Sequence, residues 1–260
     1  MFDWALYLEA LESMATFGLL GWVLSVFLRN VTIVDSMWAM FFLLGVLCFV
    51  TGNETMTERG LLILVLVTAW SARLTGYLTW RNRPMSRGMQ HEDHRYAAIR
   101  KNNQPFWFKS LYIVFGFQVL LAWIISLPLL GAANSSSPLS WLDGLGLALW
   151  LFGFLWESIG DAQLSRFKAD PANRGKVMDS GLWRYSRHPN YFGECCLWWG
   201  FYLIALSAGA WWSLPAPVLM TLLLLKVSGV ALLEKDIGER RPAYAAYIAR
   251  TNAFIPGLPR

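Results

Sequence analysis

Long apolar runs, separated by short polar segments, constrain this sequence most strongly. A helix needs about 20 mostly apolar residues to cross a bilayer, because it rises about 1.5 Å per residue through roughly 30 Å of hydrocarbon. Charged residues make up 15% of the chain, well below the roughly 25% usual in soluble domains. The sequence therefore predicts an all-α integral membrane protein, a bundle of about seven transmembrane helices. The expected spans cover approximately 13–28, 34–51, 60–80, 108–130, 142–164, 190–209 and 213–233.

Basic residues are distributed very unevenly between the two ends of this predicted bundle. Of the 22 Lys and Arg residues, only Arg59 falls on one side, and Arg73 and Lys226 fall within spans. All the others lie on the opposite side, mainly in the connections 81–107 and 165–189 and in the C-terminal tail. Because positively charged loops stay in the cytoplasm, we expect the N-terminus outside and the C-terminus inside, as in a multi-pass protein of a bacterial inner membrane. Membrane insertion explains the net charge of +5, so no nucleic-acid partner is predicted.

The chain shows no sign of a second domain or a redox centre. No internal repeat, low-complexity tract or linker divides it, so we predict one transmembrane domain, 1–260. Cys48, Cys195 and Cys196 all lie in apolar runs, and the last two are adjacent and poorly placed for a disulfide. We interpret all three as packing residues, and we predict no metal site.

Five ionisable residues lie within the predicted spans: Asp35, Arg73, Glu157, Asp161 and Lys226. Charged groups in the bilayer are costly and usually face a partner or a cavity. For Asp35 and Arg73 the alternatives are a structural ion pair and a catalytic site, and the Lys226 side chain can reach the interface. Glu157 and Asp161 are four residues apart, so both carboxylates project from one helical face near the cytoplasmic end. Two carboxylates on one face need a partner that supplies hydrogen-bond donors.

Tryptophans are abundant, and several lie away from the span ends. There are 15 in the chain, and Trp38 and Trp70 are among those in span interiors. Interior aromatic side chains can form the wall of a pocket for a flat apolar ligand, or they can simply pack. The composition alone does not distinguish these interpretations.

The most informative motif is GLWRYSRHPNYFGE, just before the sixth predicted span. Arg184, Arg187 and His188 supply positive charge or hydrogen-bond donors, and Asn190 supplies an amide. Glu194 enters the span one turn later. A donor-rich turn that leads a carboxylate into a helix suits a nucleotide-like ligand with phosphates and an amide. The alternative is a helix entrance lined with interfacial arginines, which leaves Asn190 and Glu194 unexplained.

This motif, with LWWGFYL after it, resembles the C-terminal signature of the steroid 5α-reductase family, and most closely its bacterial branch. The ending YAAYIARTNAFIP and the earlier segments WSARL and HEDHRY are similar to that family as well. The likeness runs over most of the chain, but only about the last hundred residues are specific. It implies a seven-helix reductase that binds NADPH from the cytoplasmic side. Such an enzyme reduces the carbon–carbon double bond of a 3-oxo-Δ4 steroid or a similar enone lipid.

The resemblance also implies a set of cofactor residues. Asp161 matches an aspartate ligand, Lys168 falls at a basic position, and Arg250 corresponds to a phosphate contact. Asn190 and Glu194 match the residues nearest the nicotinamide amide. With the donors of the motif, the predicted NADPH-binding residues are Asp161, Lys168, Arg184, Tyr185, Arg187, His188, Asn190, Tyr191, Glu194, Tyr247 and Arg250.

The substrate half of the chain departs from the family pattern. Eukaryotic members have a Gln-Glu pair where this chain has Val34 and Asp35, a Tyr where it has Trp70, and an Asn where it has Glu157. Hydride addition to an enone requires an acid that polarises the carbonyl. We predict Asp35, protonated through burial, or Tyr77 for that role, with Arg73 beside them. The predicted substrate contacts are Trp38, Trp70 and Glu157.

Two other classes compete with this prediction. Membrane methyltransferases of the isoprenylcysteine and phospholipid types share an Arg-His-Pro-x-Tyr-x-Gly turn and use it to bind S-adenosylmethionine. Three features argue against them: the Asn before Tyr191, the Glu after Gly193 and the basic loops. A 2′-phosphorylated dinucleotide needs more cationic side chains to bind it than the zwitterionic S-adenosylmethionine does. A seven-helix receptor or carrier is the third possibility, but it has no need of cofactor chemistry. We therefore expect a steroid-like or lipid substrate, with membrane lipids as the surroundings.

Overall fold

The computed structural model describes residues 2–52, 55–83, 91–227, 229–230, 234 and 243–260. The chain separates into two compact units, Met1–Leu139 with Ala208–Ala210, and Ser140–Ser207 with Trp211–Arg260. We expected one domain, and the sequence has no linker at this boundary. The division falls in the short connection before residue 140, which looks like any other loop between spans.

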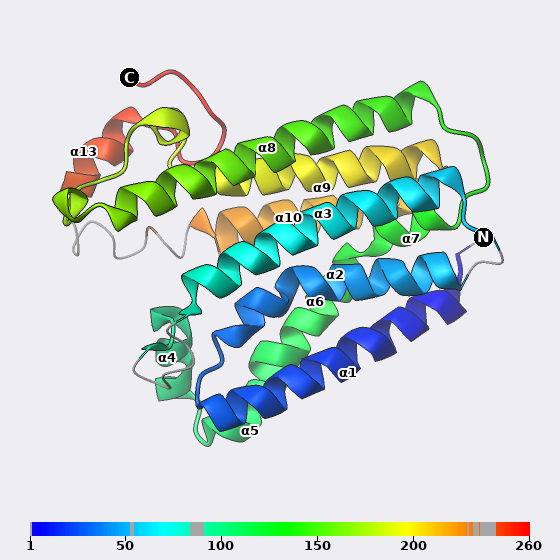
Figure 1. Cartoon of the computed structure of the whole chain (residues 1–260), viewed down its shortest axis with the longest axis horizontal. Helices are drawn as coiled ribbons and strands as arrows, with labels where there is room; N and C mark the ends of the chain where they lie inside the picture. Colours follow the sequence, from blue (N-terminus) through cyan, green and yellow to red (C-terminus); the bar gives the residue numbers. More distant parts are fainter. Residues whose placement is uncertain (1, 53–54, 84–90, 228, 231–233, 235–242) are drawn as a thin grey trace. The chain divides into compact units, whose positions relative to one another are not determined.

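The first unit is a helical bundle. Helices α1, α2 and α3 pack in sequence order, α2 lying against both of its neighbours, and α6 packs on α1 and α2. Figure 1 shows these helices in blue, cyan and green. The elements are α1 (Trp4–Leu28), α2 (Ile33–Thr51), α3 (Glu58–Arg81), α4 (His94–Asn102), α5 (Phe106–Ser110), a π-helical turn η3 (Leu111–Gly116), α6 (Phe117–Ile125) and α7 (Leu127–Ala133).

Side-chain caps fix where two of these helices begin. The Asp3 side chain accepts a hydrogen bond from the backbone N–H of Leu6 at the start of α1, and Thr57 does the same for Gly60 at the start of α3. A cap of this kind satisfies one of the backbone donors that a helix N-terminus leaves unpaired. The local sequence therefore determines where α1 and α3 begin.

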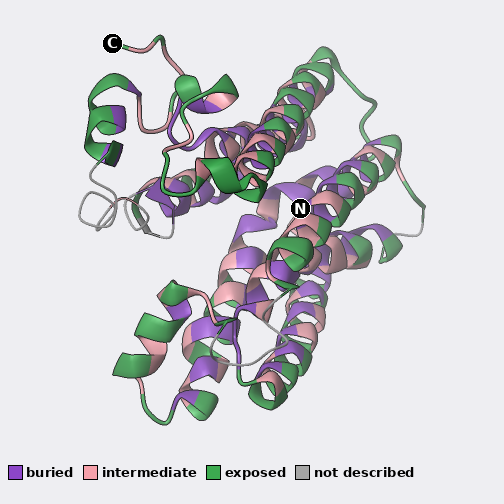
Figure 2. Cartoon of the chain, turned by 60° about the vertical axis from the view of Figure 1, so that its left-hand side comes forward, coloured by how far each residue is buried: buried purple, intermediate pink, exposed green. Residues whose placement is uncertain are grey.

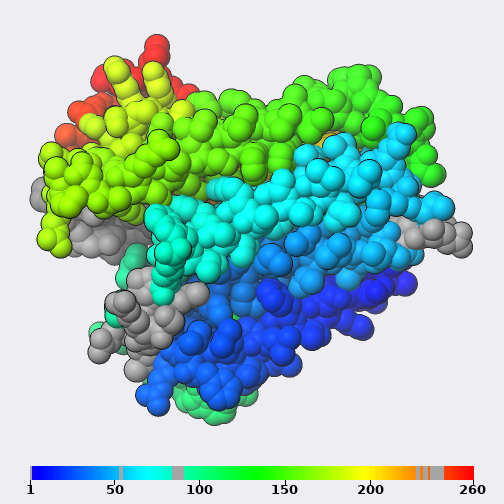
Figure 3. All heavy atoms as spheres, viewed as in Figure 1, coloured from blue at the N-terminus to red at the C-terminus, as the bar shows by residue number. Residues whose placement is uncertain are grey.

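The second unit is built on one long helix pair. Helix α8 (Trp141–Ala169) lies along α9 (Pro189–Ser207) and makes its most extensive contacts with it, as Figure 1 shows in green and yellow. The outward-facing side chains of α8 are visible in Figure 3. The remaining elements are the 3₁₀ turns η4 (Pro171–Asn173), η5 (Gly181–Arg184) and η6 (Trp211–Ser213), then α10 (Pro215–Leu222), the π-helical η7 (Leu223–Val227) and α13 (Ala243–Arg250).

Glycines spaced seven residues apart let α8 and α9 approach closely. A Cβ on Gly153 would lie 2.4 Å from the Gly193 carbonyl oxygen, and one on Gly200 would lie 2.8 Å from the Gly146 oxygen. No side chain larger than hydrogen fits at these contacts. We call this line of contact the α8–α9 seam: Gly146 and Gly153 on α8 against Gly200 and Gly193 on α9. Small residues are the usual means by which helices pack closely in lipid.

Five helices among the described residues are long and apolar enough to cross a membrane: Trp4–Leu28, Ile33–Thr51, Glu58–Arg81, Phe106–Ile125 and Trp141–Ala169. Large apolar side chains remain exposed along them, including Phe27, Val65 and Leu155, and Figure 2 shows this green outer face beside the buried purple one. Such exposure is unfavourable in water but suits lipid. The all-helical membrane class that the sequence predicted is therefore confirmed in its coarse form.

The helix bounds differ from the predicted spans in three places. α1 begins at Trp4 rather than near residue 13, because Glu9 and Glu12 lower the hydropathy without ending the helix. The fourth predicted span is divided at Ser126, where α6 ends and α7 begins. The seventh is helical to Val227, and its end at 228–233 lies largely outside the described residues. The same is true of Arg87, Lys235, Arg240 and Arg241 among the basic residues.

Candidate functional site

The segment 185–188, between η5 and α9, is held by the C-terminal tail. The backbone N–H of Arg187 donates to the Asn252 carbonyl at 2.9 Å, and the N–H of Gly257 donates to the Tyr185 carbonyl at 3.0 Å. The Ser186 hydroxyl donates to the Phe254 carbonyl at 2.8 Å. Residues about 65 positions apart therefore form one structure at the start of α9.

Glu234 binds the Arg187 and His188 side chains of this turn. Its carboxylate accepts from Arg187 Nε at 2.7 Å and Nη2 at 2.8 Å, and it lies 2.9 Å from His188 Nε2. Arg187 Nη1 also donates to the carbonyls of Ile248 and Thr251. Burial alone opposes ionisation of Glu234, but the hydrogen bonds and charge of Arg187 and His188 prevail and lower its pKa to about 2. The hydrogen bonds to Glu234 likewise raise the pKa of Arg187.

These contacts correct three of the predicted cofactor residues. Arg187 is 7% exposed and His188 5% exposed, and both side chains bind Glu234 rather than face a ligand. Tyr247 is 1% exposed, and its hydroxyl donates to the Trp183 carbonyl. Burial raises the pKa of Tyr247, so its phenol keeps the proton that this bond needs. The three residues hold the turn and the tail together.

Polar side chains of the motif and of α8 lie together where α9 begins. Asn190 Nδ2 donates to Asp161 Oδ1 at 3.1 Å, so two of the predicted cofactor residues are in contact. Asp161, Glu194 and Glu157 are 4%, 8% and 2% exposed. A Cβ on Gly193 would lie 2.6 Å from the Glu157 backbone nitrogen, so the α9 backbone runs directly past that residue. The start of α9 thus lies against the stretch of α8 that carries the buried carboxylates of Glu157 and Asp161.

The 3₁₀ turn η5 is fixed on α8 next to this region. Gln163 Oε1 accepts from the Leu182 N–H at 2.9 Å, and Trp183 Nε1 donates to the Gly160 carbonyl at 3.0 Å. Gly181 has a φ of +59°, and a Cβ there would lie 2.5 Å from the Gln163 side chain. Only glycine combines this left-handed conformation with so close a contact.

A hollow of about 400 Å³ opens beside η5, and its lining residues come from the turn, α13 and the tail. Arg184 and Arg250 supply its positive charge, and Arg250 forms an ion pair with Asp179. No ion-pair partner of the Arg184 side chain is found in the described part of the chain. The lining residues are Asp179, Ser180, Gly181, Arg184, Arg250, Thr251 and Pro259.

The other predicted cofactor residues lie around these groups. Lys168 is exposed in the last turn of α8, and Tyr185 is 37% exposed. The Tyr191 ring stacks on the imidazole of His188, with ring centroids 5.6 Å apart. Lys168 and Tyr185 are exposed, and Tyr191 is half-buried.

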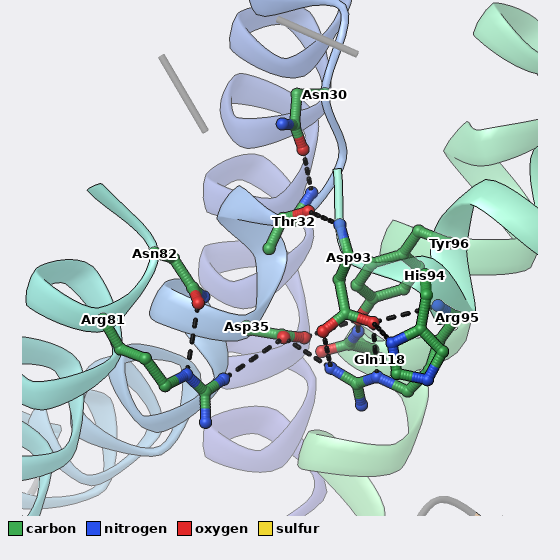
Figure 4. A network of polar contacts seen from close by, with 10 residues as sticks. All are labelled: Asn30, Thr32, Asp35, Arg81, Asn82, Asp93, His94, Arg95, Tyr96 and Gln118. Atoms are coloured by element: carbon green, nitrogen blue, oxygen red, sulfur yellow. Dashed lines mark hydrogen bonds and ion pairs between the residues drawn. The ribbon is translucent and has the colours of Figure 1, made fainter. Parts of the chain in front are cut away.

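Asp35, the predicted catalytic acid, is the centre of a polar network in the first unit (Figure 4). Its Oδ2 accepts from Arg95 at 2.8 Å, and its Oδ1 accepts from the Tyr96 hydroxyl at 2.5 Å. The Gln118 amide donates to the Tyr96 oxygen at 3.2 Å, and Arg81 lies 3.9 Å from Asp35. Both carboxylate oxygens already act as acceptors, which corrects the expectation that Asp35 donates a hydrogen bond from a protonated carboxyl.

Electrostatics reinforce this assignment of donors and acceptors. Burial first, and the charge of Asp35 second, raise the pKa of the Tyr96 phenol well above its usual range. Burial opposes the positive charge of Arg95, but Asp35 and Asp93 prevail and raise its pKa. Asp93 also caps α4 through the Arg95 N–H, and its own N–H donates to the Thr32 hydroxyl. The start of α4 is thereby attached to the start of α2.

The remaining predicted residues of the first unit are not gathered around Asp35. Arg73 and Tyr77 are half-buried, one turn apart on α3. The ion pair considered between Asp35 and Arg73 is replaced by pairs with Arg95 and Arg81. Trp38 and Trp70 pack edge-on against Phe42, with ring centroids 5.2 and 5.6 Å away. Trp70 is fully buried, so its ring is packed into the core. The third predicted substrate residue, Glu157, belongs to the other unit.

Sequence reasoning did not single out Arg95, Tyr96, Gln118, Glu234 or Asp179. A signal existed for the first two, because the segment HEDHRY is dense in charge and lies just before a span. Gln118 is one polar residue in a long apolar helix, and Asp179 is one exposed residue in a polar loop. Their roles depend on partners far away in the sequence.

The helical units, the long apolar helices and the polar helix ends define the class as a helical membrane-type protein. The chain belongs to the family described as protein of unknown function (DUF1295), whose model matches residues 21–251. It is 30% identical over 267 residues to the uncharacterized protein C594.04c of the fission yeast Schizosaccharomyces pombe, an alignment covering 91% of this chain and 76% of the yeast protein. No solved structure matches the chain.

Proposed function

We propose that the protein is an NADPH-dependent membrane reductase that reduces the carbon–carbon double bond of an enone lipid, such as a 3-oxo-Δ4 steroid. The observation that carries the proposal is the pairing of Asn190 with Asp161 at 3.1 Å in the buried α8–α9 seam, beside a hollow that holds Arg184 and Arg250. The side-chain amide and the two arginines belong to segments joined by η5, which supports assigning the carboxamide and the phosphate of one cofactor to them.

The donor set fits this cofactor. Arginine is suited to phosphate because its planar guanidinium donates two parallel hydrogen bonds, and Arg184 and Arg250 are both exposed. In the seam, Asn190 offers an amide and Glu194 a carboxylate, which complement the two polar atoms of a carboxamide. S-Adenosylmethionine carries no phosphate, so the arginine pair favours the reductase over the methyltransferase alternative.

The chemistry divides into a hydride step and a proton step. When bound, NADPH supplies a hydride, which adds to the β-carbon of the enone and places negative charge on the carbonyl oxygen. A proton then adds to the α-carbon, so the double bond gains two hydrogens in total. Asn190 and Glu194 orient the carboxamide, and the apolar surroundings of the seam exclude water. Tyr77 remains a candidate for the acid, whereas the hydroxyl proton of Tyr96 is donated to Asp35.

We also propose seven spans, with the N-terminus outside, the C-terminus in the cytoplasm of a bacterial cell, and the cofactor site facing the cytoplasm. The charge distribution supports this orientation. Arg59, the basic residue expected outside, is 1% exposed and donates to the Ser137 and Pro138 carbonyls at 2.9 Å. These contacts account for the one basic residue on the outer side, so Arg59 does not contradict the positive-inside rule.

The test is cofactor binding and turnover by the purified protein in detergent. We expect NADPH to bind and to be oxidised in the presence of an enone steroid. Asn190→Ala should weaken NADPH binding and Glu194→Gln should abolish reduction, while Glu9→Gln, an exposed glutamate of α1, changes neither. Size-exclusion profiles establish that each variant is folded. Binding of S-adenosylmethionine without binding of NADPH would refute the proposal and favour the methyltransferase.

A further inference from the structure

The hollow beside η5 already contains a negative group. Arg250 Nη2 is paired with the Asp179 carboxylate, and the two side chains are 47% and 44% exposed. Arg184 lines the same hollow. The basic residues Arg174 and Lys176 lie in the loop before Asp179, and both are exposed. Among the described residues that line the hollow, Asp179 is the acidic one, and it is paired with an arginine that an anionic ligand would need.

We propose that Asp179 is an internal competitor for the 2′-phosphate of NADPH and that it lowers the affinity of the site for that phosphate. This inference rests on the proposed function. Asp179 holds Arg250 until a phosphate displaces it, and a phosphate can do so because it brings nearly two negative charges and three acceptor oxygens. NADH lacks the 2′-phosphate and leaves the Arg250–Asp179 pair intact, so its affinity does not depend on Asp179.

The energetics of the pair make such an exchange possible. An ion pair between two half-exposed side chains is weak, because water solvates and screens both charges. A charge-assisted phosphate contact is considerably stronger. The balance thus favours the phosphate, and the competing carboxylate reduces affinity by a small factor. We expect Asp179→Asn to tighten NADPH binding about two- to fivefold, the range that corresponds to an exposed ion pair. NADH binding should be unchanged.

Asp170→Asn is the matched control. Asp170 is an exposed carboxylate in the same connection, and it caps η4 by accepting from the Ala172 N–H. Asparagine is an equally good cap, so this variant makes the same charge change without altering the hollow. It should leave NADPH affinity as in the wild type, which separates competition at Arg250 from a general effect of net charge.

The experiment measures NADPH and NADH affinities by calorimetry in detergent at one fixed ionic strength. It uses the wild type, Asp179→Asn, Asp170→Asn, Arg250→Gln and the double variant Asp179→Asn with Arg250→Gln. We expect the gain from Asp179→Asn to disappear when Arg250 is absent, because the two side chains then no longer interact. Equal NADPH affinity in Asp179→Asn and the wild type, or an equal gain in Asp170→Asn or in the double variant, would overturn the inference while the reductase proposal stands. A wild type that binds no NADPH would overturn both.

Discussion

Replacing Gly153 by alanine tests the close approach of α8 and α9 directly. The added Cβ would lie 2.4 Å from the Gly193 carbonyl oxygen and 2.6 Å from the Leu197 backbone nitrogen. An ordinary contact is about 1 Å longer. Both neighbouring atoms belong to the backbone of α9, so no side-chain rotation relieves the overlap and the helices must separate.

A second glycine of α8 gives the matched control, because a Cβ on Gly144 would meet nothing within 4 Å. Alanine in a helix interior is favoured over glycine by about 1 kcal/mol, and this gain is common to both variants. Overpacking typically costs about 1–3 kcal/mol, and it applies to Gly153→Ala alone. We therefore expect Gly144→Ala to be at least as stable as the wild type, with Gly153→Ala about 1–3 kcal/mol below Gly144→Ala.

Thermal unfolding in detergent, followed by tryptophan fluorescence, measures this difference. At about 2–4 °C per kcal/mol for chains of this size, the two midpoints should differ by at least a few degrees. NADPH affinity should also fall in Gly153→Ala. Asn190 lies one helical turn before Gly193, and its hydrogen bond to Asp161 joins α9 to α8. Equal midpoints for Gly153→Ala and Gly144→Ala would show that the backbones of α8 and α9 are not in contact.

Three further predictions concern acid stability, turnover and topology. The pKa of Glu234 is lowered to about 2 from an ordinary value of 4.5, so its stabilising effect, about 3 kcal/mol at most, is present above pH 4.5 and lost as the pH falls toward 2. Glu234→Gln should therefore remove part of the acid dependence of the unfolding midpoint, and an unchanged pH profile would contradict this. Asp35→Ala should lower enone turnover, because Asp35 holds Arg95 and Tyr96 in place, and hardly change NADPH affinity, since Asp35 and the proposed cofactor residues belong to different units; full turnover would show that the Asp35 network has no part in the reaction. Cysteine labels at 170–185 should react from the cytoplasm and those at 132–138 from outside, and the reverse pattern would invert the topology.

The sequence by itself determined the class of the protein and part of its site. Apolar runs of about 20 residues predict membrane-type helices because hydropathy is a local property, readable along one segment. The motif before α9 indicated Asn190, and the spacing of Glu157 and Asp161 placed two carboxylates on one helical face. That Asn190 meets Asp161 is shown by the structure. Local caps such as Thr57 were likewise present in the sequence.

Only the tertiary structure decided which charged groups are paired. Arg187 binds Glu234, 47 residues away, and Arg95 binds Asp35 across 60 residues. These partners depend on which helix ends meet. Hydropathy does not encode that choice, because any arginine near a helix end satisfies the same pattern. The role of the seam glycines is also decided only by the tertiary structure. Their spacing is visible in the sequence, but only the packing of α8 on α9 shows that a Cβ would have no space there.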